Sequence, residues 1–196
     1  MIYLEVILKI VTVASLAIGS YVALKGLGEW KKKLKTNSKY EISKKLLKQT
    51  FKVQHAIQLV RSPLMSLKKK DDQEDSIVKA EQRVYERRIS KLDDEWSTLH
   101  ALILEAEVEF GRNVQSVFKD LIECRASVIS NVWLHFWLKG AYAPPGATVD
   151  DSPERIRENE KIIYKVSEDP NKDEFTTKIQ NAVNKIENYL RPELEI

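Results

Sequence analysis

A repeating apolar pattern in the middle of the chain restricts that part of the fold to paired helices. Between Tyr85 and Phe110, apolar residues are spaced alternately by four and by three positions. They are Tyr85, Ile89, Leu92, Trp96, Leu99, Ile103, Ala106 and Phe110. An α-helix turns once about every 3.6 residues, so this spacing places all of these side chains along one side of a helix. We expect that side to pack against another helix along a seam like that of a coiled coil.

The pattern changes phase after Phe110, within the sequence "FGRN". It resumes with the same alternation at Val114, Val117, Leu121, Cys124 and Val128. Gly111 can cap the end of one helix while Asn113 caps the next, which would give an antiparallel hairpin. Alternatively, the extra spacing can be a stutter inside one long helix. Both interpretations fit the sequence.

Capping and breaking residues predict where the other helices begin and end. Ser38 followed by Glu41 is a capping box, which predicts a helix starting near Lys39. Pro63 predicts the end of that helix, because the residue before a proline resists helical geometry. The polar run "LKKKDDQED", residues 67–75, is then expected to form a turn.

The second half of the chain has one strong break and two further helices. The break is "GAYAPPGATVDDSP", residues 140–153, with two adjacent prolines and two glycines. A short helix is expected from Pro153 to Tyr164, because proline suits the first turn of a helix. The apolar stripe within residues 175–190 predicts a last helix, which Pro192 ends.

The N-terminal segment has the length and composition of a membrane span. From Val6 to Leu24 the only charged residue is Lys9, and these 19 residues match the roughly 20 that a helix needs to cross a bilayer. A cleaved signal peptide, processed near Ala17–Gly19, and a buried helix of a soluble protein are the alternatives. The positive charge that follows the apolar run argues against a cleaved signal peptide. Apolar residues on every face of the helix argue against a soluble protein, so the membrane span is favoured.

The composition completes the predicted fold class. With only 6 glycines and 6 prolines in 196 residues, the chain lacks the turn-forming residues of a sandwich or barrel. No run with the period of two typical of strands competes with the helical patterns. The prediction is all-α: an N-terminal transmembrane helix, then an elongated helical bundle with coiled-coil-like seams.

A basic block follows the apolar run and predicts its orientation. Residues 25–52 contain ten lysines against two glutamates, a net charge of +8, whereas residues 71–196 contain 17 Lys and Arg against 26 Asp and Glu, a net charge of −9. Positive charge beside a span stays in the cytoplasm, so we expect the N-terminus outside and the body inside. The predicted division is an anchor with its basic juxtamembrane segment, residues 1–35, and a cytoplasmic helical domain, residues 36–196.

Anionic lipid headgroups are the expected partners of this basic block. The residues expected at the lipid surface are Lys31, Lys32, Lys33 and Lys35. We expect the remaining lysines up to Lys52 to hold the first cytoplasmic helix on the same surface. Nucleic acid is not expected, because the aromatic interleaving and recognition helix of known modules are missing.

Two sets of residues are candidates for contacts between helices of different chains. Ser15, Gly19 and Ala23 recur every four residues and would let two transmembrane helices approach closely. The sequence "NVWLHFWLK" places Trp133, Phe136 and Trp137 within about one and a half helical turns. These aromatic residues can pack against the last helix or form a surface that binds a partner.

No residue pattern predicts catalysis, a cofactor or a metal site. His55, His100 and His135 lie on different predicted helices without the spacing of a metal motif, and the single cysteine, Cys124, falls on the apolar seam. The chain lacks a nucleophile elbow, a phosphate-binding glycine loop and a dinucleotide fingerprint. An enzyme without a recognisable motif remains an alternative.

Several stretches resemble uncharacterised bacterial single-pass inner-membrane proteins with a cytoplasmic helical domain. They are "EWKKKLK", "YEISKKLLKQTFKVQHAIQLVRSPLMS", "LEAEVEFG" and "DEFTTKIQNAVNKIENYLRPEL". Together they cover most of the chain, although none is a catalytic motif. The resemblance implies a bacterial inner-membrane location and assigns no site residues.

These observations predict a membrane-tethered helical interaction or scaffold protein. Its cytoplasmic helices would bind a second copy of the chain or a helical protein partner through a seam or through the aromatic residues of "NVWLHFWLK". The alternative is an effector that acts on the membrane and whose transmembrane helix self-associates.

Overall fold

The computed structural model of the chain describes residues 2–63, 77–142, 146, 151–165, 167, 169 and 172–195. For residues 2–14 and Ala17 it describes the backbone alone. The elements are α1 (Ile2–Val60), α2 (Ile77–Phe110), α3 (Asn113–Leu138), α4 (Pro153–Ile163), α5 (Glu174–Leu190) and the 3-10 helix η2 (Arg191–Glu193). No strand occurs among these residues. The all-α prediction and the helical bundle are therefore confirmed.

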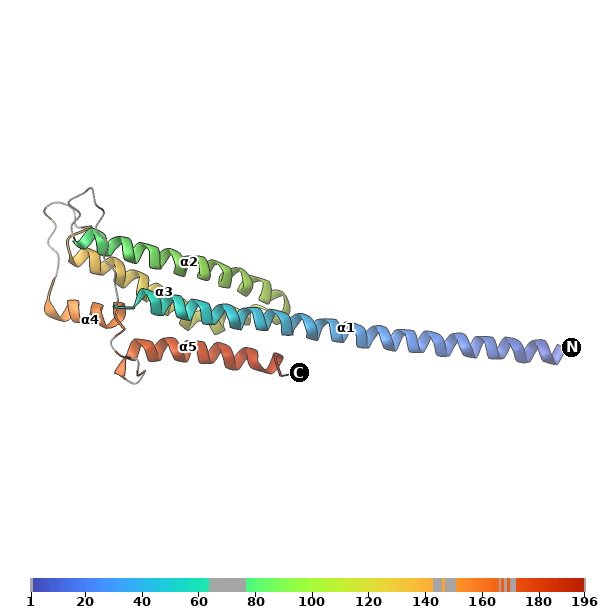
Figure 1. Ribbon diagram of the computed structural model, residues 1–196. Helices are drawn as coiled ribbons and strands as arrows, with labels where there is room; N and C mark the ends of the chain where they lie inside the picture. The colour runs from blue at the N-terminus through green and yellow to red at the C-terminus, as the bar shows by residue number, and fades with distance from the viewer. Residues whose placement is uncertain are drawn as a thin grey trace.

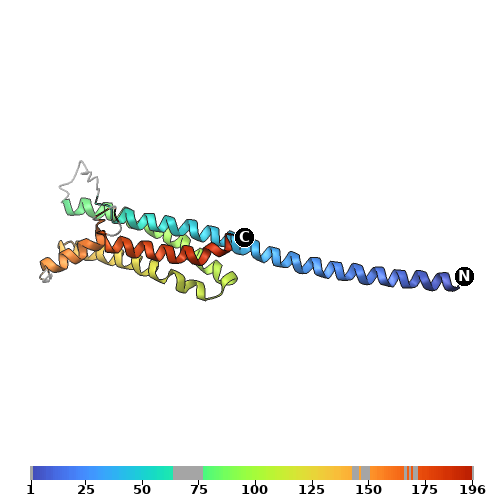
Figure 2. The same ribbon diagram turned by 90° about the horizontal axis from the view of Figure 1, so that it is seen from below.

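Four of the helices form an antiparallel bundle, and α1 extends far beyond it. The order around the bundle is α1, α2, α3, α5, so that α1 and α3 lie on opposite corners (Figures 1 and 2). The N-terminal part of α1 projects as a single rod. The chain's C-terminus lies where α1 enters the bundle, and the opposite end, which carries α4, is called the distal end below (Figure 1).

The core contains the apolar positions that the seams predicted. On α2, Tyr85, Leu92, Leu99, Ile103 and Ala106 are buried, while Ile89, Trp96 and Phe110 are partly buried. On α3, Val114, Val117, Leu121, Cys124 and Val128 are all buried. The periodicity identified these residues because a helix in a bundle buries one stripe and leaves the rest to water.

The chain breaks at Gly111, so the hairpin is correct and the stutter is wrong. Gly111 has a φ of 79°, a left-handed conformation that glycine adopts at little cost, and its amide donates to the Glu107 carbonyl at 2.9 Å. The predicted cap is wrong, because Arg112 occupies the N-cap position and Asn113 is the first helical residue of α3. The turn therefore depends on the glycine and not on a side-chain cap.

The predicted helix start near Lys39 is also wrong, because α1 continues through this region without a break. The Ser38 hydroxyl donates to Glu109 at 2.7 Å on α2 and does not cap a helix. Residues 36–38 contain neither glycine nor proline, and a continuous helix satisfies their backbone groups as well as a cap would. The predicted boundary between residues 35 and 36 lies inside α1, and Ile42 is the first buried side chain among those of α1 that the structure describes.

The other helix ends agree with the sequence. Helix α1 ends at Val60, ahead of Pro63, and α3 ends at Leu138, directly before the predicted break. Ser152 precedes α4, and α5 ends two residues before Pro192. The expected turn at residues 67–75 lies outside the described residues.

The predicted membrane span receives no support here. Among the residues whose side chains are described, no helix is long and apolar enough to cross a membrane. Most of the predicted span, residues 6–14 and Ala17, falls outside that set. The transmembrane helix therefore stays a prediction.

Candidate interaction surface on α3

The three aromatic residues predicted as a partner surface divide between the core and the exterior. Trp133 is 54% exposed and Trp137 is half-buried, but Phe136 is only 1% exposed. Phe136 follows the inner seam of α3 and packs edge-on against Tyr85, with ring centroids 5.6 Å apart. It must be removed from the predicted surface, because its side chain is rotated about 60° from that of Trp133 toward Tyr85 on α2, whereas Trp137 is rotated about 40° to the other side.

Tyr142 takes the place of Phe136 in the exposed aromatic group. Trp133 stacks on Trp137 at 5.2 Å between ring centroids and on Tyr142 at 6.1 Å. The Tyr142 hydroxyl accepts a hydrogen bond from Gln82 at 3.1 Å, which ties the group to α2. Tyr142 follows α3 in an irregular segment, where helical periodicity gives no signal, so the sequence did not identify it.

The aromatic group lies at the end of a longer apolar face. Residues 126–138 of α3 contain no Asp, Glu, Lys or Arg. We define the outer α3 face as the partly or fully exposed residues Ile122, Ala126, Ile129, Ser130, Trp133 and Trp137. They follow one another at helical spacing on the side of α3 away from its buried seam.

Two ion pairs border this face, and one of them joins α3 to α2. Arg125 donates to Asp93 at 2.6 Å and lies over the Trp96 ring at 5.2 Å, so that it joins α3 to α2. Lys119 and Glu123, which stand on either side of Ile122 in the sequence, form an ion pair at the start of the face. The face is therefore a rigid apolar strip with a polar margin, as in protein interfaces.

A buried polar cluster lies directly beneath the aromatic group. The His135 Nε2 atom is 3.0 Å from Glu81 Oε1, and Lys139 Nζ donates to Glu81 Oε2 at 2.6 Å. Burial lowers the pKa of His135, and the contact with Glu81 offsets this only in part. Burial alone would raise the pKa of Glu81, but its hydrogen bonds with Lys139 and His135 outweigh this and lower it.

This cluster fastens the start of α2 to the end of α3, and sequence spacing could not reveal it. Glu81 and His135 are 54 positions apart. Burial also raises the pKa values of the neighbouring Tyr85 and Tyr164 hydroxyls. Across the described part of the chain, no three His, Cys, Asp or Glu side chains gather in a way that could hold a metal ion.

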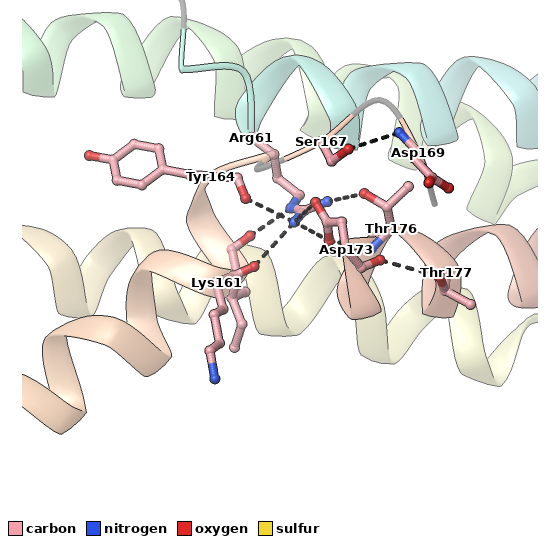
Figure 3. Close-up of polar contacts among 9 residues, drawn as sticks. Arg61, Lys161, Tyr164, Ser167, Asp169, Asp173, Thr176 and Thr177 are labelled. Carbon is pink, nitrogen blue, oxygen red and sulfur yellow. Dashed lines mark hydrogen bonds and ion pairs between the residues drawn. The ribbon is translucent and has the colours of Figure 1, made fainter. Parts of the chain in front are cut away.

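A second buried cluster surrounds Arg61, one residue after α1 (Figure 3). The Arg61 guanidinium is fully buried and donates to both oxygens of Asp173 at 3.0 Å. It also donates to Thr176 Oγ1 and to the carbonyls of Lys161, Ile162 and Tyr164. All of these partners belong to α4, to α5 or to the segment between them, so one side chain joins three helices at the distal end.

The electrostatics of this cluster indicate a structural role. Burial lowers the pKa of Arg61. Burial would raise the pKa of Asp173, but hydrogen bonds from the Thr176 amide and from Arg61 outweigh it, so the pKa falls. All three nitrogens of the guanidinium donate hydrogen bonds within the protein, to five residues in all, and the group is fully buried.

The structure places the other predicted residues on the projecting part of α1. Lys31, Lys32, Lys33 and Lys35 are exposed there. Ser15, Gly19 and Ala23 are exposed further toward the N-terminus, and a Cβ atom added to Gly19 would meet nothing within 4 Å. Neither set contacts the bundle's core.

Comparisons with protein-family models, with curated proteins and with solved structures each give no match. The class of the molecule therefore rests on its own architecture. It is an all-helical bundle protein whose first helix extends beyond the bundle and whose third helix presents an uncharged aromatic face.

Proposed function

We propose that the chain is a membrane-tethered scaffold protein whose outer α3 face binds a helix of a partner protein. The exposure of Trp133 in an uncharged strip of α3 is the observation that carries this proposal. Exposed contiguous apolar patches on folded proteins mark interaction sites, and tryptophan is enriched among the residues that dominate binding energy. A strip of helical spacing suits a helical partner.

The tether is proposed from the sequence of α1 and from its continuity. Residues 6–24 have the length of a membrane span, and α1 continues from them into the bundle without a break. Ile42, the first buried residue among those described, comes 18 positions after Leu24, or about 27 Å along a helix. We propose a bacterial inner-membrane location, with the N-terminus outside and the bundle in the cytoplasm.

Continuity of α1 limits which lysines can touch lipid. Lys31 and Lys35 would lie about 10 and 17 Å beyond Leu24, within reach of anionic headgroups and their screened field. Lys44 and Lys52 would lie about 30 and 42 Å beyond it if α1 stands upright. We therefore restrict the proposed lipid contact to Lys31, Lys32, Lys33 and Lys35.

The arrangement of the bundle favours a different protein as the partner over a second copy. Because α1 and α3 lie on opposite corners of the bundle, a contact between the α1 helices of two chains does not by itself bring their outer α3 faces together. The faces would then remain available to a partner. Nothing in the described part of the chain specifically favours the membrane-acting effector or an enzyme.

Photocrosslinking in the native cell tests this proposal. A photoreactive residue at position 133 of the full chain should give a discrete heteromeric adduct, and one at position 119 should not. Position 119 is a matched control, because it is exposed on nearly the same side of α3 about four turns away.

A charge placed in the face should abolish the adduct. Ser130→Arg should remove crosslinking from position 133, whereas Ser116→Arg, on the same side of α3 but outside the face, should leave it intact. Equal crosslinking from positions 119 and 133, or an adduct consisting of two copies of the chain, would reject a heteromeric partner at this face.

A further inference from the structure

A second candidate surface lies between α1 and α2 near the distal end. It is a hollow of about 260 Å³ lined by Ala56, Leu59, Val84, Arg87, Arg88 and Lys91. We call it the α1–α2 hollow. Its floor consists of the three apolar residues, and its rim carries three cationic side chains.

One cation of the rim is fixed by the fold. The Arg88 guanidinium donates to the Ser62 carbonyl at 2.6 Å and to the Val60 carbonyl at 3.4 Å. These carbonyls lie at the C-terminal end of α1, where backbone acceptors lack helical partners and the helix dipole is negative. Arg88 therefore has a structural purpose and forms a rigid positive wall.

The other two cations have no such purpose. Arg87 and Lys91 are exposed, and neither forms an ion pair with any residue that the structure describes. The Arg87 Nε atom donates only to the carbonyl of Arg83. Like charges four positions apart on a helix repel each other, so Arg87 and Lys91 destabilise α2 slightly.

Two acidic residues of α2 near the rim are engaged elsewhere, and a third, the exposed Asp94, forms no ion pair with Lys91 in the described part of the chain. Glu86 accepts from Gln82 at 3.0 Å, and Glu95 accepts from Gln49 at 2.7 Å and pairs with Lys52. Residues 71–196 carry a net charge of −9, so Arg87 and Lys91 stand out as two exposed cations without an ion pair in the described part of this acidic body. The rim is therefore complementary to negative charge that the described structure does not supply.

The size and floor of the hollow indicate the kind of ligand. Its volume is below the roughly 300 Å³ at which pockets for small molecules begin. An aliphatic side chain would fill the floor, whereas a phosphate or nucleic-acid backbone would match only the rim. We propose that the α1–α2 hollow docks an acidic segment of a partner protein, with an aliphatic side chain on the floor and carboxylates beside Arg87 and Lys91.

Binding of a synthetic acidic peptide to the full chain in detergent micelles tests this inference. The probe is a fluorescent twelve-residue peptide of Glu, Asp and Leu, with Leu at helical spacing. Arg87→Glu together with Lys91→Glu should weaken binding by about tenfold or more, because two attractions become repulsions. Arg157→Glu with Lys161→Glu is the matched control, since it reverses two exposed charges four positions apart on α4 and should change binding little.

Changes in the probe distinguish this docking from general attraction of anions. Replacing Leu by Ser, or Glu and Asp by Gln and Asn, should each abolish binding. Equal binding of the Ser peptide, or full competition by inorganic phosphate, would overturn the proposal in favour of a simple anion site. Binding that requires Asp71, Asp72, Glu74 and Asp75 to be neutralised first would also overturn it, by making the chain's own acidic segment the occupant. None of these outcomes depends on whether the outer α3 face binds a partner.

Discussion

Arg61 is the side chain on which the distal end of the bundle most depends. It is fully buried, and its hydrogen bonds join the end of α1 to α4 and α5. Its partner Asp173 also caps α5 by accepting a hydrogen bond from the Thr176 amide at 2.9 Å. Removing the guanidinium would leave a buried carboxylate and three carbonyls without their donor, which costs more than the lost contacts themselves.

We predict that Arg61→Met lowers the free energy of unfolding by about 3–5 kcal/mol, the range for breaking a buried ion pair. Arg61→Met with Asp173→Leu should be less destabilising than the two single changes added together, because no charge is left unpaired. Chemical denaturation of the full chain in detergent measures both, with the exposed Arg157→Met as control. A loss below about 1 kcal/mol, the range of surface pairs, would show that Arg61 does not hold the helices together.

His135 makes stability depend on pH. Burial lowers its folded-state pKa below the ordinary value near 6.5, so the unfolded chain takes up this proton first as the pH falls. The contribution of His135 to the free energy of unfolding is therefore complete above about pH 6.5 and is lost progressively as the pH falls below it. The lowered pKa values of Glu81 and Asp173 act in the same direction, but only below about pH 4.5.

The free energy of unfolding, measured at pH 7.5 and at pH 5.0, should isolate the contribution of His135. The unmodified chain should lose stability between these values, and His135→Gln, which keeps a polar group beside Glu81, should lose clearly less. His100→Gln, on the exposed side of α2, should behave like the unmodified chain. An equal loss in the unmodified chain and in His135→Gln would assign the pH dependence to other groups.

Helices with strong apolar periodicity could be predicted from the sequence. Helix boundaries could not be predicted where the same residues fit two conformations. The seams of α2 and α3 were visible because burial selects apolar residues at fixed spacing. The prediction of a helix start from the capping box at Ser38 failed because the same residues fit the interior of a helix, which satisfies their backbone groups as well as a cap would. At Gly111 the sequence allowed two geometries with the same apolar positions.

The buried polar contacts of the bundle were not predictable from spacing. Glu81 with His135 and Arg61 with Asp173 are pairs joined by tertiary folding across 54 and 112 positions. The sequence identified Trp133 and Trp137 as surface candidates. It did not show that Phe136 is buried, because Phe136 lies at the border between the buried and the exposed side of α3. The α1–α2 hollow is likewise formed by two helices whose register becomes known only in the structure.

The turn between α2 and α3 should be sensitive to the residue at position 111. With φ at 79°, Gly111→Ala should cost about 1–2 kcal/mol, the penalty of a left-handed backbone with a Cβ atom. Gly111→Asn should cost less, because asparagine tolerates this conformation. Thermal unfolding of the two variants gives the order directly, and equal stabilities would mean that the turn can change its geometry.

At the scale of the whole molecule, α1 fixes the height of both candidate surfaces. If residues 6–24 span the bilayer, the end of α1 at Val60 lies roughly 50 Å beyond the hydrocarbon, given the rise of a straight helix. The outer α3 face and the α1–α2 hollow both lie near that distal end. A scaffold built in this way would hold partners at a fixed distance from the membrane, whereas a hinge in α1 would remove that constraint.

A distance measured along α1 in a lipid bilayer decides between these two possibilities. Spin labels at Leu27→Cys and His55→Cys, both exposed positions, would be placed in a Cys124→Ala background, which removes the single native cysteine. A continuous helix predicts one narrow distribution centred near 42 Å between the labelled backbones, from 28 residues at about 1.5 Å each. A broad distribution, or one shifted well below that value, would show a hinge between residues 27 and 55 and contradict a rigid tether.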